Sequence, residues 1–580
     1  MLQLRRDLLR SLEAGIVGLF LIQAIRFVYA GLYARANSAD LVERVADPAA
    51  LAGTPGVVEL ATVQNEIIAL AALLLLPVLA LVIGRWRASL PFAVILVALG
   101  RSLAIQTRDL EILGGSLVIG AGLLYAALVI IRRPSFFPAI ILVGLAGDQF
   151  IRALGDTTDP SWQRGYVLDV AGYFSVGIEI VIAVAAIILI FLSIGLWFVE
   201  QREARAEGYV APPRGVLNLW GALALGGILF LELTLLGLPN VVARWADVDY
   251  AGVVPWMLAA TTLPLVPEIR AAAGRFAGMF DGAWRGWLWL LLLGLLLVVG
   301  DRYDGIPAAI ALALAQFAIG LTLWWLIQTG APTHNLTGLF MPFTVLAFAL
   351  LAVGEYFTYD YAYVADFDPP YDGLDDFLRA FRGMGLALVL IAALLAAIPM
   401  ILARRRIPWR GGRATYTFLT LLLVVAISAG GAAAAAGEGV RRPVNPDCLR
   451  VATFNIHGGY SQFFDPNLER VAQLIELNGA DVVMLQEVET GRLASYGVDQ
   501  VLWLARRLNM ESVFLPQNEA LQGLAVLSRV PITRSQGLML PSEGNQAAVL
   551  HVVLDPDRLA EDTGEDVPGE LHVYNAWLGF

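Results

Sequence analysis

The chain has 580 residues, of which 58% are hydrophobic and only 15% are charged, and its formal net charge is −11. A soluble domain has roughly 45–50% apolar and about 25% charged residues, so this composition excludes a purely soluble protein and indicates a polytopic membrane protein. The negative charge argues against a nucleic-acid-binding protein, which normally carries a basic face. Because Cys448 is the single cysteine, an internal disulfide is excluded.

Apolar stretches fill the chain up to residue 440. A helix that spans a membrane needs about 20 consecutive, mostly apolar residues. Thirteen stretches meet this length, give or take a few residues, so residues 1–440 are predicted to form an all-α membrane region. They lie near 12–34, 64–84, 88–106, 112–131, 135–154, 170–199, 216–238, 251–268, 284–300, 306–328, 336–356, 383–402 and 415–435.

The distribution of arginine predicts the orientation of these helices, because cytoplasmic loops carry an excess of basic residues. The N-terminus and most of the even-numbered connections are rich in arginine, whereas the opposite loops are poorer in it. The most acidic of the opposite loops is Tyr359–Arg382. The pattern predicts a cytoplasmic N-terminus, and an odd number of spans then places everything after residue 435 outside the cytoplasm.

Ionisable side chains interrupt several of the apolar stretches. Such residues are costly in a membrane and are candidates for function, although a structural ion pair or a position near the membrane interface is the favoured explanation for most of them. Asp148 and Arg152 lie four residues apart on one predicted helix and could neutralise each other. The residues are Glu13, Arg26, Glu66, Arg101, Asp148, Arg152, Glu179 and Glu232.

A small, charged and proline-containing segment ends the membrane region, which predicts a linker at 441–447 and a separate domain at 448–580. In this domain LRVATFNI and DVVMLQE read as strands, and an amphipathic helix between them is expected to begin at Asp465-Pro466. A second helix, VDQVLWLARRL, precedes the further strands SVFLP, GLAVLSRVPI, QAAVLHVVL and ELHVYNAWL. This order predicts an α/β sandwich.

Polar groups follow the first two strands of this domain. Asn455 ends the first strand and Glu487 ends the second, with one predicted helix between them. The strands can therefore be neighbours and present an amide and a carboxylate at one edge. A hard divalent cation and a phosphate need such a pair.

The motifs FNIHGG, DVVMLQEVE and GLAVLSRVPI occur in this order and at these spacings from Leu449 onward. Together they resemble the endonuclease/exonuclease/phosphatase superfamily, which includes DNase I-like nucleases, neutral sphingomyelinases and inositol-polyphosphate phosphatases. The resemblance implies a four-layer αββα sandwich and hydrolysis of phosphate esters with Mg²⁺ or Mn²⁺. It covers the C-terminal domain and not the membrane region.

The resemblance also implies roles for individual residues. Glu487 would be the metal-ligating carboxylate, and Asn455 would orient the metal and the phosphate through its amide. His457 follows the first strand and could approach the phosphate, although a plain loop histidine is an alternative. Asn575 matches the asparagine of the family's Asn-Thr-His-Leu-like strand end and is a further catalytic candidate.

The sequence departs from the family in two places. Trp577 stands where the family has a histidine that contacts the scissile phosphate, and tryptophan cannot take a proton in its place. The later Gly-Asp-x-Asn and Asp-His motifs, which supply further site groups, do not occur before Phe580. We therefore expect a truncated domain that lacks catalytic activity in this form.

The sequence leaves several functions open. The first is a membrane-anchored phosphoesterase or phosphodiesterase that acts outside the cytoplasm, with membrane lipids as partners and lipid headgroups or other phosphate esters as substrates. The second is a transporter or lipid-handling membrane protein whose C-terminal domain is a pseudoenzyme or sensor. An extracellular nuclease is a third, although a basic stripe for nucleic acid is not evident. A membrane anchor without chemistry of its own is a fourth. The pattern gives no oligomeric state.

Overall fold

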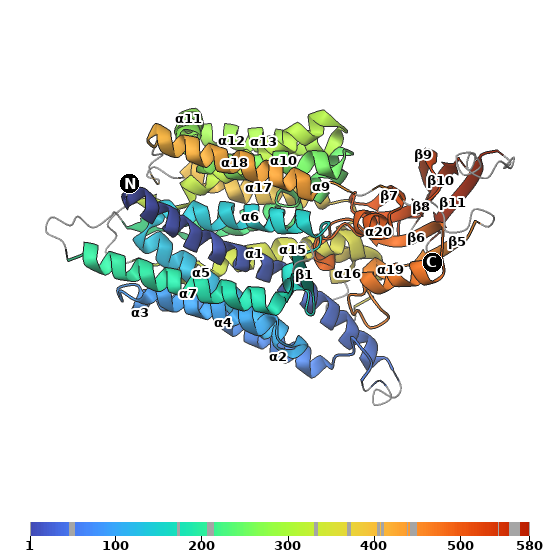
Figure 1. The fold of residues 1–580 in the computed structure, drawn as a ribbon, viewed down its shortest axis with the longest axis horizontal. Helices are drawn as coiled ribbons and strands as arrows, with labels where there is room; N and C mark the ends of the chain where they lie inside the picture. Colours follow the sequence, from blue (N-terminus) through green and yellow to red (C-terminus); the bar gives the residue numbers. More distant parts are fainter. Residues whose placement is uncertain are drawn as a thin grey trace.

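A computed structural model gives the fold of the chain. It describes residues 2–578 except 46–50, 52, 171–173, 206–213, 283, 330–334, 368–372, 403–406, 408–410, 438, 441–448, 543 and 556–568. A bundle of helices forms the larger part, and a sheet-containing domain lies at the end of the bundle opposite the N-terminus (Figure 1). The predicted linker 441–447 and Cys448 lie outside the described residues.

The bundle is built from long helices and a few short ones. Its helices are α1 (Leu2–Glu43), α2 (Leu60–Leu73), α3 (Ala80–Ile83), α4 (Ser89–Ala104), α5 (Arg108–Arg132), α6 (Phe137–Leu154), α7 (Ile178–Glu203), α8 (Leu219–Leu231), α9 (Pro239–Ala246), α10 (Tyr250–Thr262), α11 (Pro267–Ala277), α12 (Arg285–Arg302), α13 (Ile306–Leu326), α14 (Thr337–Phe340), α15 (Pro342–Asp360), α16 (Leu374–Arg379), α17 (Gly385–Leu402) and α18 (Ala414–Ala434). Short 3-10 turns connect several of them, including η8 (Tyr361–Tyr363), and a π-helical turn, η5 (Glu232–Leu236), follows α8.

Long apolar helices indicate a membrane protein, as the composition predicts. Within the described ranges, ten helices are long and apolar enough to cross a membrane, or eleven if the bent pair at 250–280 forms one span. This pair is bent by 82° where Pro267 starts α11. Each of the thirteen predicted stretches coincides with a helix, but α4 has only 16 residues. The count of thirteen spans and their orientation therefore stay predictions.

Two short antiparallel pairs of strands lie among the helices. The strands β1 (Val167–Val170) and β2 (Phe174–Gly177) form a pair before α7. The hydrophobic pattern predicted a helix from about residue 170, but α7 begins at Ile178 because the pair of strands precedes it. The strands β3 (Gly215–Val216) and β4 (Gln328–Thr329) join the segments before α8 and after α13.

Most charged side chains inside the bundle have partners. Arg26 of α1 donates two hydrogen bonds to Asp148 of α6, at 2.9 and 2.8 Å, and both side chains are fully buried. The expected pairing of Asp148 with Arg152 is therefore wrong, because Asp148 faces α1. Arg152 donates instead to the carbonyl oxygens of Tyr496 and Gly497 in the C-terminal domain.

The described part of the C-terminal domain contains two sheets and two main helices. The first sheet has the order β5 (Val451–Asn455), β6 (Val482–Glu489), β8 (Gln522–Ser528), β7 (Glu511–Asn518). In it β5 and β6 run parallel, whereas the other neighbours are antiparallel. The second sheet is antiparallel, with the order β11 (Leu571–Trp577), β10 (Ala548–Leu554), β9 (Ile532–Met539). The helices are α19 (Leu468–Leu477) and α20 (Gln500–Leu508).

Alternate residues of β6 face different cores, as expected for a strand with a side-chain period of two. Val483 and Leu485 pack with Val471 of α19 and Leu504 of α20 in one apolar cluster. Val482 belongs to a second cluster, which contains residues of β8 and β10 and fills the space between the sheets. The described residues thus form a helical layer and two sheet layers, and the fourth layer of the expected αββα sandwich stays a prediction.

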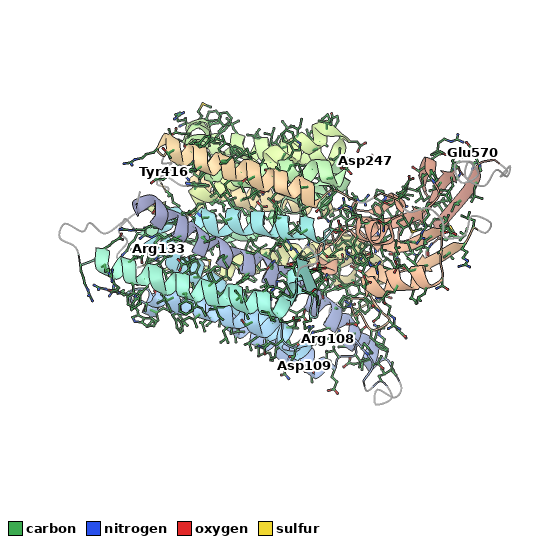
Figure 2. All side chains as sticks on the ribbon, viewed as in Figure 1. Arg108, Asp109, Arg133, Asp247, Tyr416 and Glu570 are labelled. Atoms are coloured by element: carbon green, nitrogen blue, oxygen red, sulfur yellow. The ribbon has the colours of Figure 1, made fainter. Side chains whose placement is uncertain are left out.

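Two local expectations need correction. The helix after β5 begins at Leu468 and not at Asp465. The side chain of Asp465 pairs instead with Arg108 at the start of α5, at 2.5 Å, and Figure 2 shows Arg108 at the end of the bundle that faces the C-terminal domain. The stretch GLAVLSRVPI is not one strand, because β8 ends at Ser528 and β9 begins at Ile532.

Candidate active site

The candidate active site lies at the edge where β5 and β6 end. These strands pair in parallel with Asn455 opposite Gln486, so the amide and the carboxylate meet as the sequence predicted. Asn455 Nδ2 donates a hydrogen bond to Glu487 Oε1 at 2.8 Å. Asn455 is exposed and Glu487 is half-buried, so a ligand in solution can reach the pair.

A β-bulge positions Glu487. Leu485 pairs with Ala525 and Val488 pairs with Gly523, so β6 contains one more residue than β8 between these points. Glu487 has a φ of +52°, a left-handed conformation that residues other than glycine rarely adopt. Bulges re-aim side chains next to active sites. Here the bulge turns Glu487 away from the alternation of β6 and toward Asn455.

The loop after β5 returns to Asn455. The backbone N–H of His457 donates to Asn455 Oδ1 at 3.0 Å, so both ends of this amide are hydrogen-bonded. His457, Gly458 and Gly459 all have positive φ values. A Cβ atom on Gly459 would lie 2.8 Å from the side-chain nitrogen of Gln500, so this tight turn requires glycine.

Gln500 is a positioning residue that the sequence did not reveal. Its side chain donates to the carbonyl oxygen of Gly458 at 2.5 Å and accepts from the backbone N–H of Glu489 at 2.9 Å. It thus joins the loop after β5 to the end of β6, the two segments that carry Asn455 and Glu487. In the sequence Gln500 appears only as the first residue of a helix, with no signal that it bridges two loops.

His457 and Asn575 differ in their relation to this pair. His457 is exposed beside Asn455, and its ring contacts that of Phe464, with centroids 5.4 Å apart. Asn575 is buried between the two sheets, where its amide donates to the carbonyl oxygens of Leu485 and Ala525 at 2.8 and 2.9 Å. Asn575 also accepts from Gln486 Nε2 at 2.6 Å. The structure therefore brings His457 to the candidate site and gives Asn575 a place in the core.

The Asn455–Glu487 pair fits part of a divalent metal site. Mg²⁺ prefers oxygen ligands and is often held by only one or two carboxylates together with water and substrate phosphate. Glu487 supplies one such carboxylate, and Asn455 holds it in a fixed orientation. Across the described part of the chain, no group of three or more His, Cys, Asp or Glu side chains could hold a metal ion. The pair would therefore hold a cation jointly with water and phosphate, and the ion would neutralise charge on the phosphoryl oxygens.

The edge that carries the pair faces the end of the helical bundle. Tyr33 of α1 contacts Tyr460 and Phe464 in the loop after β5, with ring centroids 6.1 and 6.0 Å apart. Tyr363, at the end of η8, lies close enough to Glu487 to interact with its charge and hydrogen-bonds with Asn545. The candidate site is thus beside the helix ends and not on the far side of the domain.

Polar contacts also fix the loop after β6 to the bundle. Asn240 of α9 donates to the carbonyl oxygens of Thr490 and Gly497 at 3.2 and 3.0 Å. Arg244, one turn further along α9, pairs with Asp499 at 2.7 Å. Asp499 also caps α20 by accepting from the backbone N–H of Leu502. These contacts hold the segment 490–499, which directly follows the strand of Glu487.

Arg492 is a buried cation in this segment. Its side chain is 2% exposed and pairs with Glu489 and with Asp360 of α15. Burial alone would lower the pKa of Arg492, but the charges of Glu489 and Asp360 outweigh burial and raise this pKa well above its usual value. The guanidinium is therefore a fixed positive charge where the domain meets the bundle.

Comparisons with known proteins find a family match in the C-terminal domain. Residues 452–565 match the Endonuclease/Exonuclease/phosphatase family. A crystal structure described as an endonuclease/exonuclease/phosphatase from Beutenbergia cavernae is similar, with 26% identity and a TM-score of 0.17. The similar region covers 22% of this chain and 37% of that chain, and no curated protein matches. The C-terminal part of the chain therefore carries a domain of the endonuclease/exonuclease/phosphatase family, a superfamily of nuclease- and phosphatase-type hydrolases.

Proposed function

We propose that the protein is a membrane-anchored, metal-dependent phosphoesterase that acts outside the cytoplasm on phosphate esters of lipid headgroups. The observation that carries this proposal is the exposed pair of Asn455 and Glu487, with its 2.8 Å hydrogen bond. In a domain of a hydrolase family, an amide-supported carboxylate at a strand end is suited to hold a divalent cation against a phosphate.

The position of the pair supports a lipid substrate. Tyr33 of α1 and Tyr363 of η8 belong to the bundle, and both lie beside the loops that surround the pair. A headgroup at the surface of a bilayer would therefore reach Glu487 over a short distance. The N-terminus and the loops predicted to share its side of the membrane carry an excess of arginine, which supports a cytoplasmic position for them. An odd number of spans would then put the C-terminal domain on the opposite side, outside the cytoplasm.

The test uses the purified protein reconstituted in lipid nanodiscs. Hydrolysis of a chromogenic phosphodiester, phosphatidylglycerol, phosphatidylcholine and plasmid DNA would be measured with Mg²⁺, with Mn²⁺ and with a chelator. We expect metal-dependent release of phosphorylated headgroups. Glu487→Gln should reduce turnover about 100-fold or more, because a fixed charge is lost from the reaction centre. Asn455→Ala should reduce it about 10-fold, as expected for a group that orients a ligand.

Glu476→Gln is the matched control, because Glu476 lies on the exposed face of α19 and pairs with Arg507 at 3.0 Å. This variant should retain full turnover. Turnover that survives the chelator, or that is equal in Glu487→Gln and Glu476→Gln, would contradict the proposal. Cleavage of plasmid DNA without lipid hydrolysis would replace it with the extracellular nuclease.

A second candidate, a lipid-handling membrane protein with a regulatory C-terminal domain, is favoured by Trp577. This residue is half-buried at the end of β11 and packs against the cluster between the sheets, where the resemblance would place a histidine. If this candidate holds, the protein would bind Mg²⁺ and phosphate without hydrolysis. Isothermal titration of wild type and Glu487→Gln in nanodiscs distinguishes binding from turnover.

A further inference from the structure

A large cavity opens at the end of the bundle that carries the N-terminus. Its volume is about 2460 Å³, and it extends between α1, α6, α10 and α18. Figure 2 shows Arg133 and Tyr416, which both line it, at the end of the bundle away from the C-terminal domain. Pockets for small molecules usually measure about 300–1,000 Å³, so this cavity suits a larger ligand.

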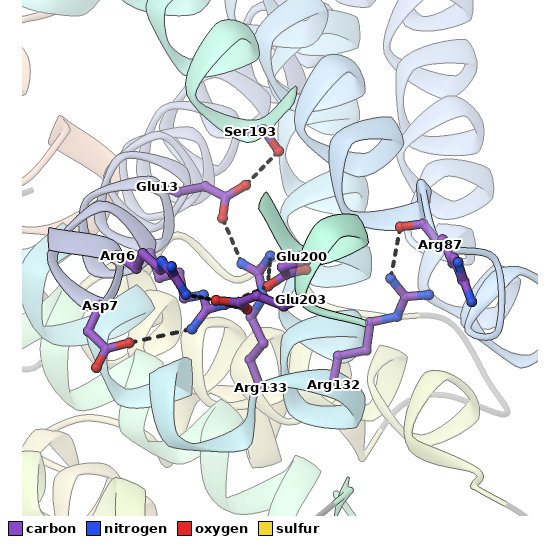
Figure 3. A network of polar contacts seen from close by, with 10 residues as sticks. Arg6, Asp7, Glu13, Arg87, Arg132, Arg133, Ser193, Glu200 and Glu203 are labelled. Carbon is purple, nitrogen blue, oxygen red and sulfur yellow. Dashed lines mark hydrogen bonds and ion pairs between the residues drawn. The ribbon is translucent and has the colours of Figure 1, made fainter. Parts of the chain in front are cut away.

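The mouth of the cavity is cationic. Among the described residues, eight arginines line it, against the three acidic side chains of Asp7, Glu200 and Glu203. These acids already pair with arginines, because Arg10 contacts Asp7 and Glu200, Arg133 contacts Glu200 at 2.6 Å, and Arg6 contacts Glu203. Figure 3 shows Glu200 beside Arg133 and Glu203 beside Arg6. The acids are therefore used within the wall, and an excess of positive charge remains.

Four of the lining arginines have no carboxylate partner among the described residues. Arg132 donates only to the backbone carbonyl oxygens of Gly84, Trp86 and Arg87, one of which appears in Figure 3. The side chains of Arg85, Arg214 and Arg413 are exposed and form no ion pair or hydrogen bond within the described part of the chain. Their charges are free to meet an anion.

The interior of the cavity is apolar. Val143 and Phe150 of α6 line one side, and Leu419, Leu423 and Ile427 of α18 line the other. These five positions extend along the helices away from the arginines. Trp197 of α7 also lines the cavity, and its indole N–H is buried without a hydrogen-bond partner in the described structure.

From these features we infer that the cavity binds one anionic phospholipid, with the phosphate at its arginine-lined mouth and an acyl chain between α6 and α18. An anion compensates the unpaired guanidinium groups, which recognise phosphate oxygens through charge-assisted hydrogen bonds. The acyl chain of such a lipid would fill the apolar part of the cavity. A soluble phosphate would leave the apolar part unfilled, and a zwitterionic lipid would leave positive charge uncompensated. This inference is independent of the proposed hydrolysis, because the cavity and Glu487 lie at opposite ends of the bundle.

The test is native mass spectrometry of the full chain, titrated with dioleoylphosphatidylglycerol, dioleoylphosphatidylcholine or inorganic phosphate. We expect one tightly held phosphatidylglycerol per chain and much weaker binding of the other two probes. The triple change Arg85→Gln, Arg214→Gln, Arg413→Gln should weaken the first binding step at least about tenfold. The loss of even one charge-assisted contact to the phosphate costs about that factor. Arg275→Gln is the charge control, since Arg275 is exposed on α11 and does not line the cavity.

A second pair of variants tests the apolar part. Leu423 lines the cavity, whereas its neighbour Leu422 does not, and the two are 52% and 54% exposed. Leu423→Asn should weaken phosphatidylglycerol binding several-fold, and Leu422→Asn should leave it unchanged. Size-exclusion chromatography would verify that each variant folds. Equal binding of phosphatidylcholine, equal binding of free phosphate, or identical behaviour of the triple variant and Arg275→Gln would each overturn the inference.

Discussion

The guanidinium of Arg492 joins Asp360, at the end of α15, to Glu489, at the end of β6. Its nitrogens lie 2.5 Å from Asp360 Oδ2 and 2.6 Å from Glu489 Oε1. Glu489 follows Glu487 by two residues on the same strand. One buried cation therefore links the helical bundle to the strand that carries the candidate metal ligand.

Replacing Arg492 should loosen the C-terminal domain from the bundle. In Arg492→Met the buried carboxylate of Glu489, which is 5% exposed, loses its cation. Removal of one partner from a buried pair destabilises by about 3–5 kcal/mol. We expect a lower thermal midpoint and faster hydrogen exchange in segment 490–499, measured by mass spectrometry on the full chain in detergent.

Arg534→Met is the matched control for this change. Arg534 pairs with Glu570 at 2.6 Å, but the two side chains are 65% and 53% exposed. Exposed pairs contribute about 0–1 kcal/mol, so this variant should keep the wild-type midpoint. Equal midpoints for the two variants would show that Arg492 does not hold the domain in place.

Replacing Asn575 should destabilise the C-terminal domain through its core. Asn575→Ala removes both donors to the carbonyl oxygens of Leu485 and Ala525, and it deprives Gln486 of an acceptor. An unsatisfied buried polar group costs about 1–3 kcal/mol, so we expect a loss of about 3 kcal/mol in urea unfolding followed by hydrogen exchange in β6 and β8. Asn478→Ala is the control, because Asn478 is an exposed residue at the end of α19. A loss no larger than the control's would remove Asn575 from the core interaction.

Alkaline pH should weaken the contact between the loop after β5 and the bundle. Burial, and then the nearby charges of Tyr496, Tyr33 and Glu489, raise the pKa of Tyr460 well above its usual value. An unfolded tyrosine titrates near pH 10. The folded state therefore holds this proton more tightly, so stability is complete below about pH 10 and falls as the pH rises above it.

The variant Tyr460→Phe separates this effect from general alkaline damage. It loses the hydrogen bond to the carbonyl oxygen of Ala494, worth about 1 kcal/mol at neutral pH, but its midpoint should fall less steeply between pH 9 and 11. Tyr574→Phe should leave the wild-type slope intact, since Tyr574 is 62% exposed. The measurement is the thermal midpoint against pH, and identical slopes for wild type and Tyr460→Phe would contradict the assignment.

Local patterns in the sequence were sufficient for much of the fold. VATFNI corresponds to β5, an edge strand whose residues alternate between exposed and half-buried. The apolar stretches correspond to helices, and DVVMLQE and QAAVLHVVL correspond to β6 and β10, because buried strands and spanning helices are continuously apolar. The strand β9 was missed for the same reason. Its residues 533–539 are exposed and it lies at the edge of its sheet, so it carries no apolar alternation to detect.

Part of the candidate site could also be predicted from the sequence, and part could not. The meeting of Asn455 and Glu487 was predictable, because parallel neighbours end at one edge of a sheet. The roles of Gln500 and Arg492 were not, because both depend on segments that only the tertiary fold brings together. The partner of Asp148 was predicted wrongly for the same reason. The spacing of four residues pointed to Arg152, whereas the fold places Arg26 of another helix beside Asp148.

Glu487 is the residue that makes β6 longer than its partner strand β8 at the bulge. Val483, Leu485 and Val488 all contribute to the cluster beneath α19 and α20, and this spacing works only because one extra residue lies between the last two. Excision of Glu487 would restore a regular strand and keep each of these three side chains in its cluster. The chain could thus lose the acid without losing the domain, and a relative that had abandoned phosphate chemistry would be recognisable by a second motif shorter by one residue.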